Sequence, residues 1–119
     1  MRSPAGDRLK VLFVCSRNQW RSPTAEAVWR HHPALAVRSA GTSASARRKL
    51  ALRDVEWADV IFFMEHEHKS RAASRFGPAL RQKSQHVLEI PDEYQVMDPE
   101  LVELLEDSVA QLLGLQPPA

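Results

Sequence analysis

One cysteine and one arginine, Cys15 and Arg21, have the types and spacing to carry chemistry. A short apolar run precedes Cys15, and a Ser-Pro pair and a helical pattern follow Arg21. A strand, a short loop and a helix start in that order predict a cradle in which loop amides and the helix N-terminus converge on an anion. That field stabilises a thiolate over a thiol. The Arg21 guanidinium is a planar, permanently charged fork that matches two phosphate oxygens, so the stretch indicates a thiolate facing a bound phosphate.

The same two residues also allow a plainer interpretation. Cys15 would then be a buried thiol at a strand end, and Arg21 a solvated residue at a helix start. The flanking residues favour the anion cradle, because Ser22 suits a helix N-cap and Pro23 suits the first helical position. Spacing alone leaves both interpretations open.

Composition sets the broad class of the protein. The chain has 119 residues, 44% of them hydrophobic, which predicts one domain over residues 1–119 with a real core and a flexible arm at residues 1–7. A net charge of +1 argues against a dedicated nucleic-acid-binding protein. A single cysteine allows no internal disulfide and fits a reducing compartment. With no signal peptide and no apolar run long enough for a membrane span, we expect a cytoplasmic protein without membrane contact.

The order of apolar and helical patterns predicts an α/β fold. Because the predicted strands alternate with helices, we expect a three-layer sandwich with a four-stranded parallel sheet. Ligands of such sheets bind beyond the C-terminal strand ends, near a topological switch point, so the phosphate-binding loop should lie between the first strand and the first helix. The predicted strands are Arg8–Val14, Ala34–Ala40, Val60–Met64 and Gln85–Ile90, and the predicted helices are Ser22–His31, Leu50–Trp57, His66–Phe76 and Asp98–Leu115.

Three helix details follow from the same patterns. Gly77-Pro78 should end the third helix. His66 and His68 open that helix two positions apart, and such residues point to different faces, so we expect a solvated helix start and no metal or cofactor. The apolar face of the final helix should consist of Leu101, Leu104, Leu105, Val109, Leu112 and Leu113.

The stretch VLFVC-x5-RSPTAEAV, Val11 to Val28, resembles the active-site signature of the low-molecular-weight protein tyrosine phosphatases. Further similarities follow in order: Ser39-Ala40-Gly41-Thr42, then Ala58-Asp59-Val60-Ile61 with Met64, then an Asp-Glu-Tyr stretch. The resemblance covers most of the chain, although the chain is shorter than is usual in that family. It implies a short, divergent member that hydrolyses phosphate monoesters.

The resemblance implies a role for each loop residue. Cys15 would attack phosphorus and form a phosphocysteine, and Arg21 would hold the transferring phosphoryl group. In the family, the Ser after the Arg hydrogen-bonds the thiolate, and the loop Asn leans on a Ser of the Ser-Ala-Gly-Thr piece. The residues expected to bind substrate or phosphate are Ser16, Arg17, Asn18, Gln19, Trp20, Ser22, Ser39 and Tyr94.

Two aspartates compete for the role of general acid. Asp98-Pro99 matches the Asp-Pro dipeptide of the family, but it also has the form of an ordinary helix start. The family's acid lies some distance before the last helix with an aromatic residue two positions on, which Asp92 and Tyr94 match. We therefore predict Asp92 as the acid and Asp98 as the alternative.

The loop also departs from the family pattern, whose interior is usually Leu-Gly-Asn-Ile-Cys. Arg17 replaces a Gly-like position and adds a charge at the mouth. Trp20 replaces a second cysteine that can form a protective disulfide, so that switch is absent here. The segment after Thr42 is shorter, which removes part of the pocket wall and leaves phosphotyrosine specificity open.

The leading hypothesis is thus a cysteine-dependent phosphatase acting on phosphotyrosine-like monoesters. Its partner would be a phosphorylated protein or a small phosphomonoester, with inorganic phosphate or another oxyanion able to occupy the loop. One alternative is a non-catalytic module that binds phosphate or a phosphoprotein. An arsenate reductase is a weaker alternative. The thiol-dependent arsenate reductases with this fold relay electrons through additional cysteines, and this chain has only Cys15.

Overall fold

Four parallel strands form the centre of the computed structural model, which describes residues 8–116. The strands are β1 (Leu9–Cys15), β2 (Leu35–Gly41), β3 (Val60–Phe63) and β4 (Ser84–Val87), and their order across the sheet is β2-β1-β3-β4. The flexible arm predicted at residues 1–7 lies outside the described part. All four residues of β3 are buried, as expected for a central strand that is covered on both faces.

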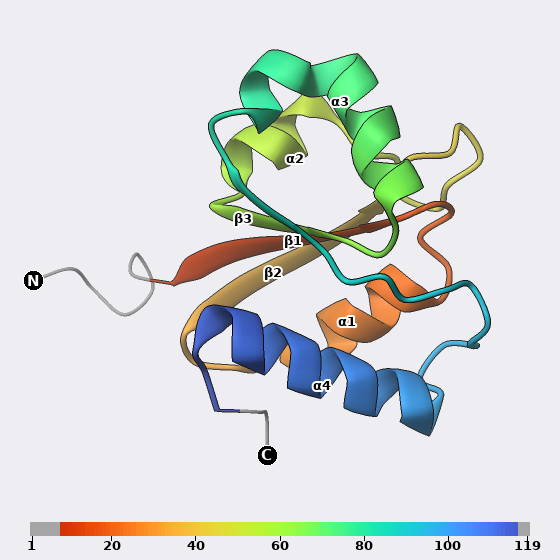
Figure 1. The fold of residues 1–119 in the computed structure, drawn as a ribbon, viewed down its shortest axis with the longest axis vertical. Coiled ribbons are helices and arrows are strands. Elements are labelled where there is room, and N and C mark those ends of the chain that lie inside the picture. The colour runs from red at the N-terminus through yellow and green to blue at the C-terminus, as the bar shows by residue number, and fades with distance from the viewer. Residues whose placement is uncertain (1–7, 117–119) are drawn as a thin grey trace, which may run out of the picture.

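Two pairs of helices cover the sheet (Figure 1). Helices α1 (Arg21–Trp29) and α4 (Pro99–Leu113) lie on one face, and α2 (Leu52–Trp57) and α3 (His66–Leu80) lie on the other. The three-layer α/β sandwich and its four-stranded parallel sheet are therefore confirmed. The loop between β1 and α1 runs at the rim of the sheet, where the sequence predicts it.

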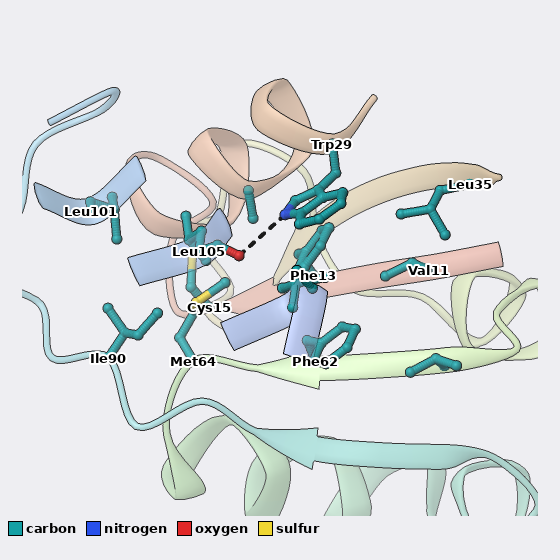
Figure 2. Close-up of a cluster of buried hydrophobic side chains, with 14 residues drawn as sticks. Val11, Phe13, Cys15, Trp29, Leu35, Phe62, Met64, Ile90, Leu101 and Leu105 are labelled. Atoms are coloured by element: carbon teal, nitrogen blue, oxygen red, sulfur yellow. Dashed lines mark hydrogen bonds between the residues drawn. The ribbon is translucent and has the colours of Figure 1, made fainter. Parts of the chain in front are cut away.

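Alternate residues of β1 enter two separate cores. Val11, Phe13 and Cys15 face α1 and α4, whereas Leu12 and Val14 face α2 and α3. This is the period-two alternation of a strand between two layers. Figure 2 shows Cys15 at the end of the row that β1 contributes, with Ile90 and Leu101 beyond it.

The strand order places the end of β1 at a topological switch point. From β1 the chain crosses to β2 on one side, and the next strand, β3, pairs with β1 on the other side. In open parallel sheets, ligands bind where connections diverge in this way, outside the carboxyl ends of the strands. Cys15 is the last residue of β1 and pairs with Gly41, the last residue of β2. The segments that follow the strands therefore meet at one rim.

Two of the differences between the predicted and the observed helix bounds have a clear physical reason. Helix α1 begins at Arg21, so Ser22 is not its N-cap; Ser22 is fully buried and its hydroxyl contacts the Cys15 sulfur instead. In α3, Gly77-Pro78 does not end the helical segment, which continues to Leu80 after a kink at Phe76 (φ −131°, ψ 28°). Proline needs no amide partner in a first turn, so the pair opens a new turn after the kink.

The buried face of α4 is narrower than its sequence predicts. Leu101, Leu105 and Val109 are fully buried, but Leu104 and Leu112 are 40% and 46% exposed. The three buried residues are four positions apart and form one stripe against β1 and α1. The sheet and α1 cover only that stripe, so the adjacent Leu104 and Leu112 remain partly exposed to solvent.

Candidate functional site

A cavity of about 290 Å³ opens beyond the end of β1. It is walled by the loop between β1 and α1 and, from far along the chain, by one aspartate. Its lining residues are Cys15, Ser16, Arg17, Gln19, Trp20, Arg21 and Asp92. All seven belong to the set of candidate residues that the sequence singled out.

The Cys15 sulfur is buried and has two hydrogen-bond partners. It lies 2.9 Å from the Ser22 hydroxyl oxygen, and the backbone N–H of Asn18 points to it at 3.3 Å. The Asn18 side-chain amide donates to the Ser22 oxygen at 2.9 Å, and a Cys15 thiolate, which has no proton to give, would accept the hydroxyl proton of Ser22. Both donors stabilise a negative charge on sulfur more than they stabilise a neutral thiol.

Asn18 holds the loop in shape. Its backbone is left-handed (φ 57°), a conformation that asparagine tolerates better than most residues. The same side-chain amide that donates to Ser22 also donates to the Ser39 hydroxyl at 2.9 Å, and Ser39 donates to the Glu26 carboxylate. The structure thus brings Asn18, Ser22 and Ser39 together, and it adds Glu26, which sequence reasoning missed.

The segment after β2 stabilises the phosphate-binding loop through main-chain hydrogen bonds. The N–H groups of Thr42 and Ser43 donate to the carbonyls of Cys15 and Ser16 at 3.0 and 2.9 Å. A Cβ atom on Gly41 would lie 2.5 Å from the Ser16 oxygen, so the backbone can approach this closely only because residue 41 is glycine. The loop is therefore held by main-chain contacts as well as by side chains.

Arg21 is buried and anchored by groups from two distant segments. Its Nη1 atom donates to the Glu65 carboxylate at 2.5 Å and to the Ile90 carbonyl at 2.8 Å. Its Nε atom lies 3.8 Å from the Asp92 carboxylate across the cavity wall. With Nη1 occupied in this way, the rest of the fork stays available to the cavity that Arg21 lines.

The buried His68 forms a hydrogen bond with the backbone of Glu65. It is 2% exposed, and its Nδ1 accepts a hydrogen bond from the Glu65 backbone N–H at 3.0 Å. Burial, and then the positive charge of Arg21, lower the pKa of His68 from 6.5 to about 4. The sequence-based expectation of a solvated helix start is wrong for His68, because the side chain turns back to cap its own helix.

The three candidates from the C-terminal half occupy different places. Asp92 lines the cavity with a side chain that is 59% exposed. Tyr94 packs against the core beneath α1 and α4, outside the cavity lining. Asp98 is the N-cap of α4: its carboxylate accepts from the Glu100 N–H at 2.9 Å, and Pro99 is the first helical residue.

Sequence reasoning missed Glu65, His68 and the Ile90 carbonyl. Glu65 directly follows Met64, just past the end of β3, so its position beyond a buried parallel strand was a usable signal. Every residue has a backbone carbonyl, so nothing in the sequence could single out that of Ile90. Within residues 8–116, no group of three or more His, Cys, Asp or Glu side chains is arranged to hold a metal ion. None of the described helices is long and apolar enough to cross a membrane.

Comparison with known proteins identifies relatives of this site. Residues 10–57 match the model of the low molecular weight phosphotyrosine protein phosphatase family. A protein-arginine-phosphatase of Bacillus subtilis (strain 168) is 34% identical over 96 residues, which span 58% of this chain and 64%, less than two thirds, of that protein.

Solved structures share the whole fold. The crystal structure of a YwlE mutant from Bacillus subtilis is 27% identical, with a TM-score of 0.64 over 88% of this chain and 99% of that one. A YwlE arginine phosphatase whose active-site cysteine is replaced by a phosphorylated serine is 25% identical, with a TM-score of 0.65 over 88% and 96% of the two chains.

Proposed function

We propose that this chain is a member of the low molecular weight phosphotyrosine protein phosphatase family and that it is a cysteine-dependent phosphatase. One observation carries the proposal. The buried Cys15 sulfur, with hydrogen-bond donors at 2.9 and 3.3 Å, shares a cavity with the Arg21 guanidinium and the Asp92 carboxyl. A nucleophile, an anion clamp and an acid in one cavity are the parts that phosphoryl transfer needs.

In the first step, the Cys15 thiolate attacks phosphorus while the bond from phosphorus to the leaving group breaks. The free edge of Arg21 and the loop amides hold the equatorial oxygens, where negative charge lies in the transition state. Protonated Asp92 gives its proton to the leaving atom. The products are a phosphocysteine and the neutral leaving group, with Asp92 now a carboxylate.

In the second step, the Asp92 carboxylate takes a proton from a water molecule, which attacks the phosphocysteine. The S–P bond breaks, inorganic phosphate forms, and the thiolate returns to its contacts with Ser22 and Asn18. The high exposure of Asp92 suits this role, since both the leaving group and the water reach the phosphorus from the open side of the cavity. Asp98 is not available for it in this arrangement because its carboxylate caps α4.

The substrate is either an aryl phosphate, such as phosphotyrosine, or a phosphoguanidine, such as phosphoarginine. The family model points to the first class, and the Bacillus relative that is named a protein-arginine-phosphatase points to the second. Trp20, 41% exposed at the cavity wall, offers a face to an aromatic ring, whereas Gln19 offers a polar group to a guanidine. Both reactions would use the same Cys15, Arg21 and Asp92.

Hydrolysis of p-nitrophenyl phosphate by the wild type and by Cys15→Ser tests the proposal. The wild type should turn over with competition by phosphate and vanadate. Cys15→Ser should be inactive but should still bind phosphate, since the amides and Arg21 remain. Two peptides of identical sequence, one with phosphotyrosine and one with phosphoarginine, then assign the substrate class by comparison of kcat/KM. A wild type that binds phosphate and hydrolyses none of these compounds would instead be a non-catalytic phosphate-binding module.

A further inference from the structure

Thr24 links two parts of the molecule that are 73 residues apart. The side chain is fully buried in the first turns of α1. Its hydroxyl donates to the carbonyl of Trp20, in the phosphate-binding loop, at 2.6 Å, and it accepts from the backbone N–H of Met97 at 2.9 Å. One hydroxyl group therefore joins the loop that holds Cys15 to the segment that carries Asp92.

The segment that carries Asp92, residues 91–97, is fixed at both ends by groups near the phosphate-binding loop. At its start, the Ile90 carbonyl accepts from Arg21 at 2.8 Å, and the Ile90 N–H donates to Met64. At its end stands the bond from Met97 to Thr24. Between these two points lie Asp92 and Tyr94, so the path of the segment past the cavity depends on both fixed ends.

The backbone at Met97, the end of the segment that carries Asp92, is held by a hydrogen bond to a residue outside that segment. Met97 has a left-handed backbone (φ 59°), which a non-glycine residue adopts at a cost in energy. Its side chain is 50% exposed, so packing of the side chain does little to hold it there. Met97 precedes α4, which starts only at Pro99, and the Thr24 hydroxyl is the acceptor for the Met97 N–H.

We propose that Thr24 is a positioning residue for the general acid: its hydroxyl sets the distance between Asp92 and the phosphoryl group on Cys15. This inference rests on the proposed function, because it concerns how the acid of that reaction is placed. Thr24 does not line the cavity and touches no reacting atom. Its effect must therefore appear in the step that needs the proton and leave anion binding intact.

The test uses Thr24→Val, which keeps the shape of the side chain but can neither donate nor accept, and Thr24→Ser, which keeps the hydroxyl. Phenyl phosphate requires protonation of its leaving group, whereas p-nitrophenyl phosphate hardly does. Thr24→Val should lower kcat/KM, which reports on formation of the phosphocysteine alone, by roughly tenfold for phenyl phosphate, should change kcat/KM for p-nitrophenyl phosphate little, and should leave the Ki for inorganic phosphate unchanged. Thr24→Ser should restore both substrates to near wild-type values.

A double-mutant cycle sharpens the result. In an Asp92→Asn background, Thr24→Val should have almost no further effect on phenyl phosphate, since the group it positions is gone. Additive losses in the cycle, equal losses for the two substrates, or failure of Thr24→Ser to recover activity would each overturn the proposal. Thermal melting shows whether Thr24→Val is folded, and Thr24→Ala replaces it if it is not.

Backbone amide exchange tests the link without using catalysis. The amide proton of Met97 should exchange faster in Thr24→Val than in the wild type and should be protected again in Thr24→Ser. An unchanged Met97 amide in a folded Thr24→Val variant refutes the link whether or not the protein is a phosphatase. Loss of turnover in the wild type itself would refute the proposed function, and with it the role in acid positioning, while the amide measurement would still report on the bond.

Discussion

Replacing Ser22 by alanine removes the hydroxyl that lies 2.9 Å from the Cys15 sulfur. When Cys15 is a thiolate, the Ser22 hydroxyl donates to the sulfur, since the competing acceptor, the Ala40 carbonyl, is farther away at 3.5 Å. A hydrogen bond to a charged group stabilises it by roughly 1.5–3 kcal/mol. Loss of this hydrogen bond should thus lower the reactivity of Cys15 toward an electrophile by roughly ten- to a hundredfold.

The rate of alkylation by iodoacetamide measures the reactivity of the Cys15 sulfur directly. Cys15 is the single cysteine of the chain, so the mass shift of the intact protein reports on it alone. The rate for Ser22→Ala should lie below the wild-type rate, and both rates are measured over a range of pH. Ser108→Ala is a matched control, because it removes a serine hydroxyl that bonds only to the Leu104 carbonyl on α4.

Two results would refute this reasoning. Superimposed rate curves for the wild type and Ser22→Ala would show that the hydroxyl does not stabilise the thiolate. An equal slowing at every pH would show that the substitution restricts access of the reagent to sulfur. Thermal melting of each variant ensures that only folded protein is compared.

The remaining predictions concern the fork, the two aspartates and the buried histidine. Arg21→Lys keeps the charge but not the bidentate geometry, so kcat/KM for p-nitrophenyl phosphate should fall by roughly 10²–10³-fold. Asp92→Asn should lower kcat/KM for phenyl phosphate by roughly a hundredfold and less for p-nitrophenyl phosphate. Asp98→Ala should instead lower the free energy of unfolding by roughly 0.5–2 kcal/mol in urea, with kinetics preserved. The folded state holds the pKa of His68 at about 4, below its ordinary value of 6.5, so stability should fall as pH drops from about 6.5 to about 4, by roughly 3 kcal/mol in all. Urea unfolding at pH 7 and pH 4 measures this loss, and His68→Asn, which keeps an acceptor near the Glu65 N–H, should show a smaller one.

The parts of the site that are local in sequence could be predicted from it. Cys15, the loop and Arg21 lie within seven residues, and their order of strand, loop and helix start is visible in the residue types. The two central strands were predictable for the same reason, since β1 and β3 consist mostly of apolar residues. The helix-capping form of Asp98-Pro99 was also readable, because a cap involves only neighbours along the chain.

What the sequence did not reveal depends on contacts between distant segments. Ser22 has the residue type of an N-cap, yet the burial of its hydroxyl beside Cys15 decides its role. His68 looks solvated until its side chain is seen folded back on Glu65. Thr24 lies in a helix start with nothing in its type or spacing that points to Met97, 73 residues further on.

The anchoring of Arg21 also has a consequence for how the site comes into being during folding. Its two firm partners are 44 and 69 residues away along the chain, so each contact closes a long loop and forms only when the ends of that loop meet. A partly folded chain with only β1, α1 and β2 in place would already have the loop around Cys15, but its guanidinium would swing freely. The fork becomes fixed only after β3 and β4 have added to the sheet. Folding of the middle and last thirds of the chain thus fixes the orientation of an arginine that lies, together with Cys15 and the loop, in the first third.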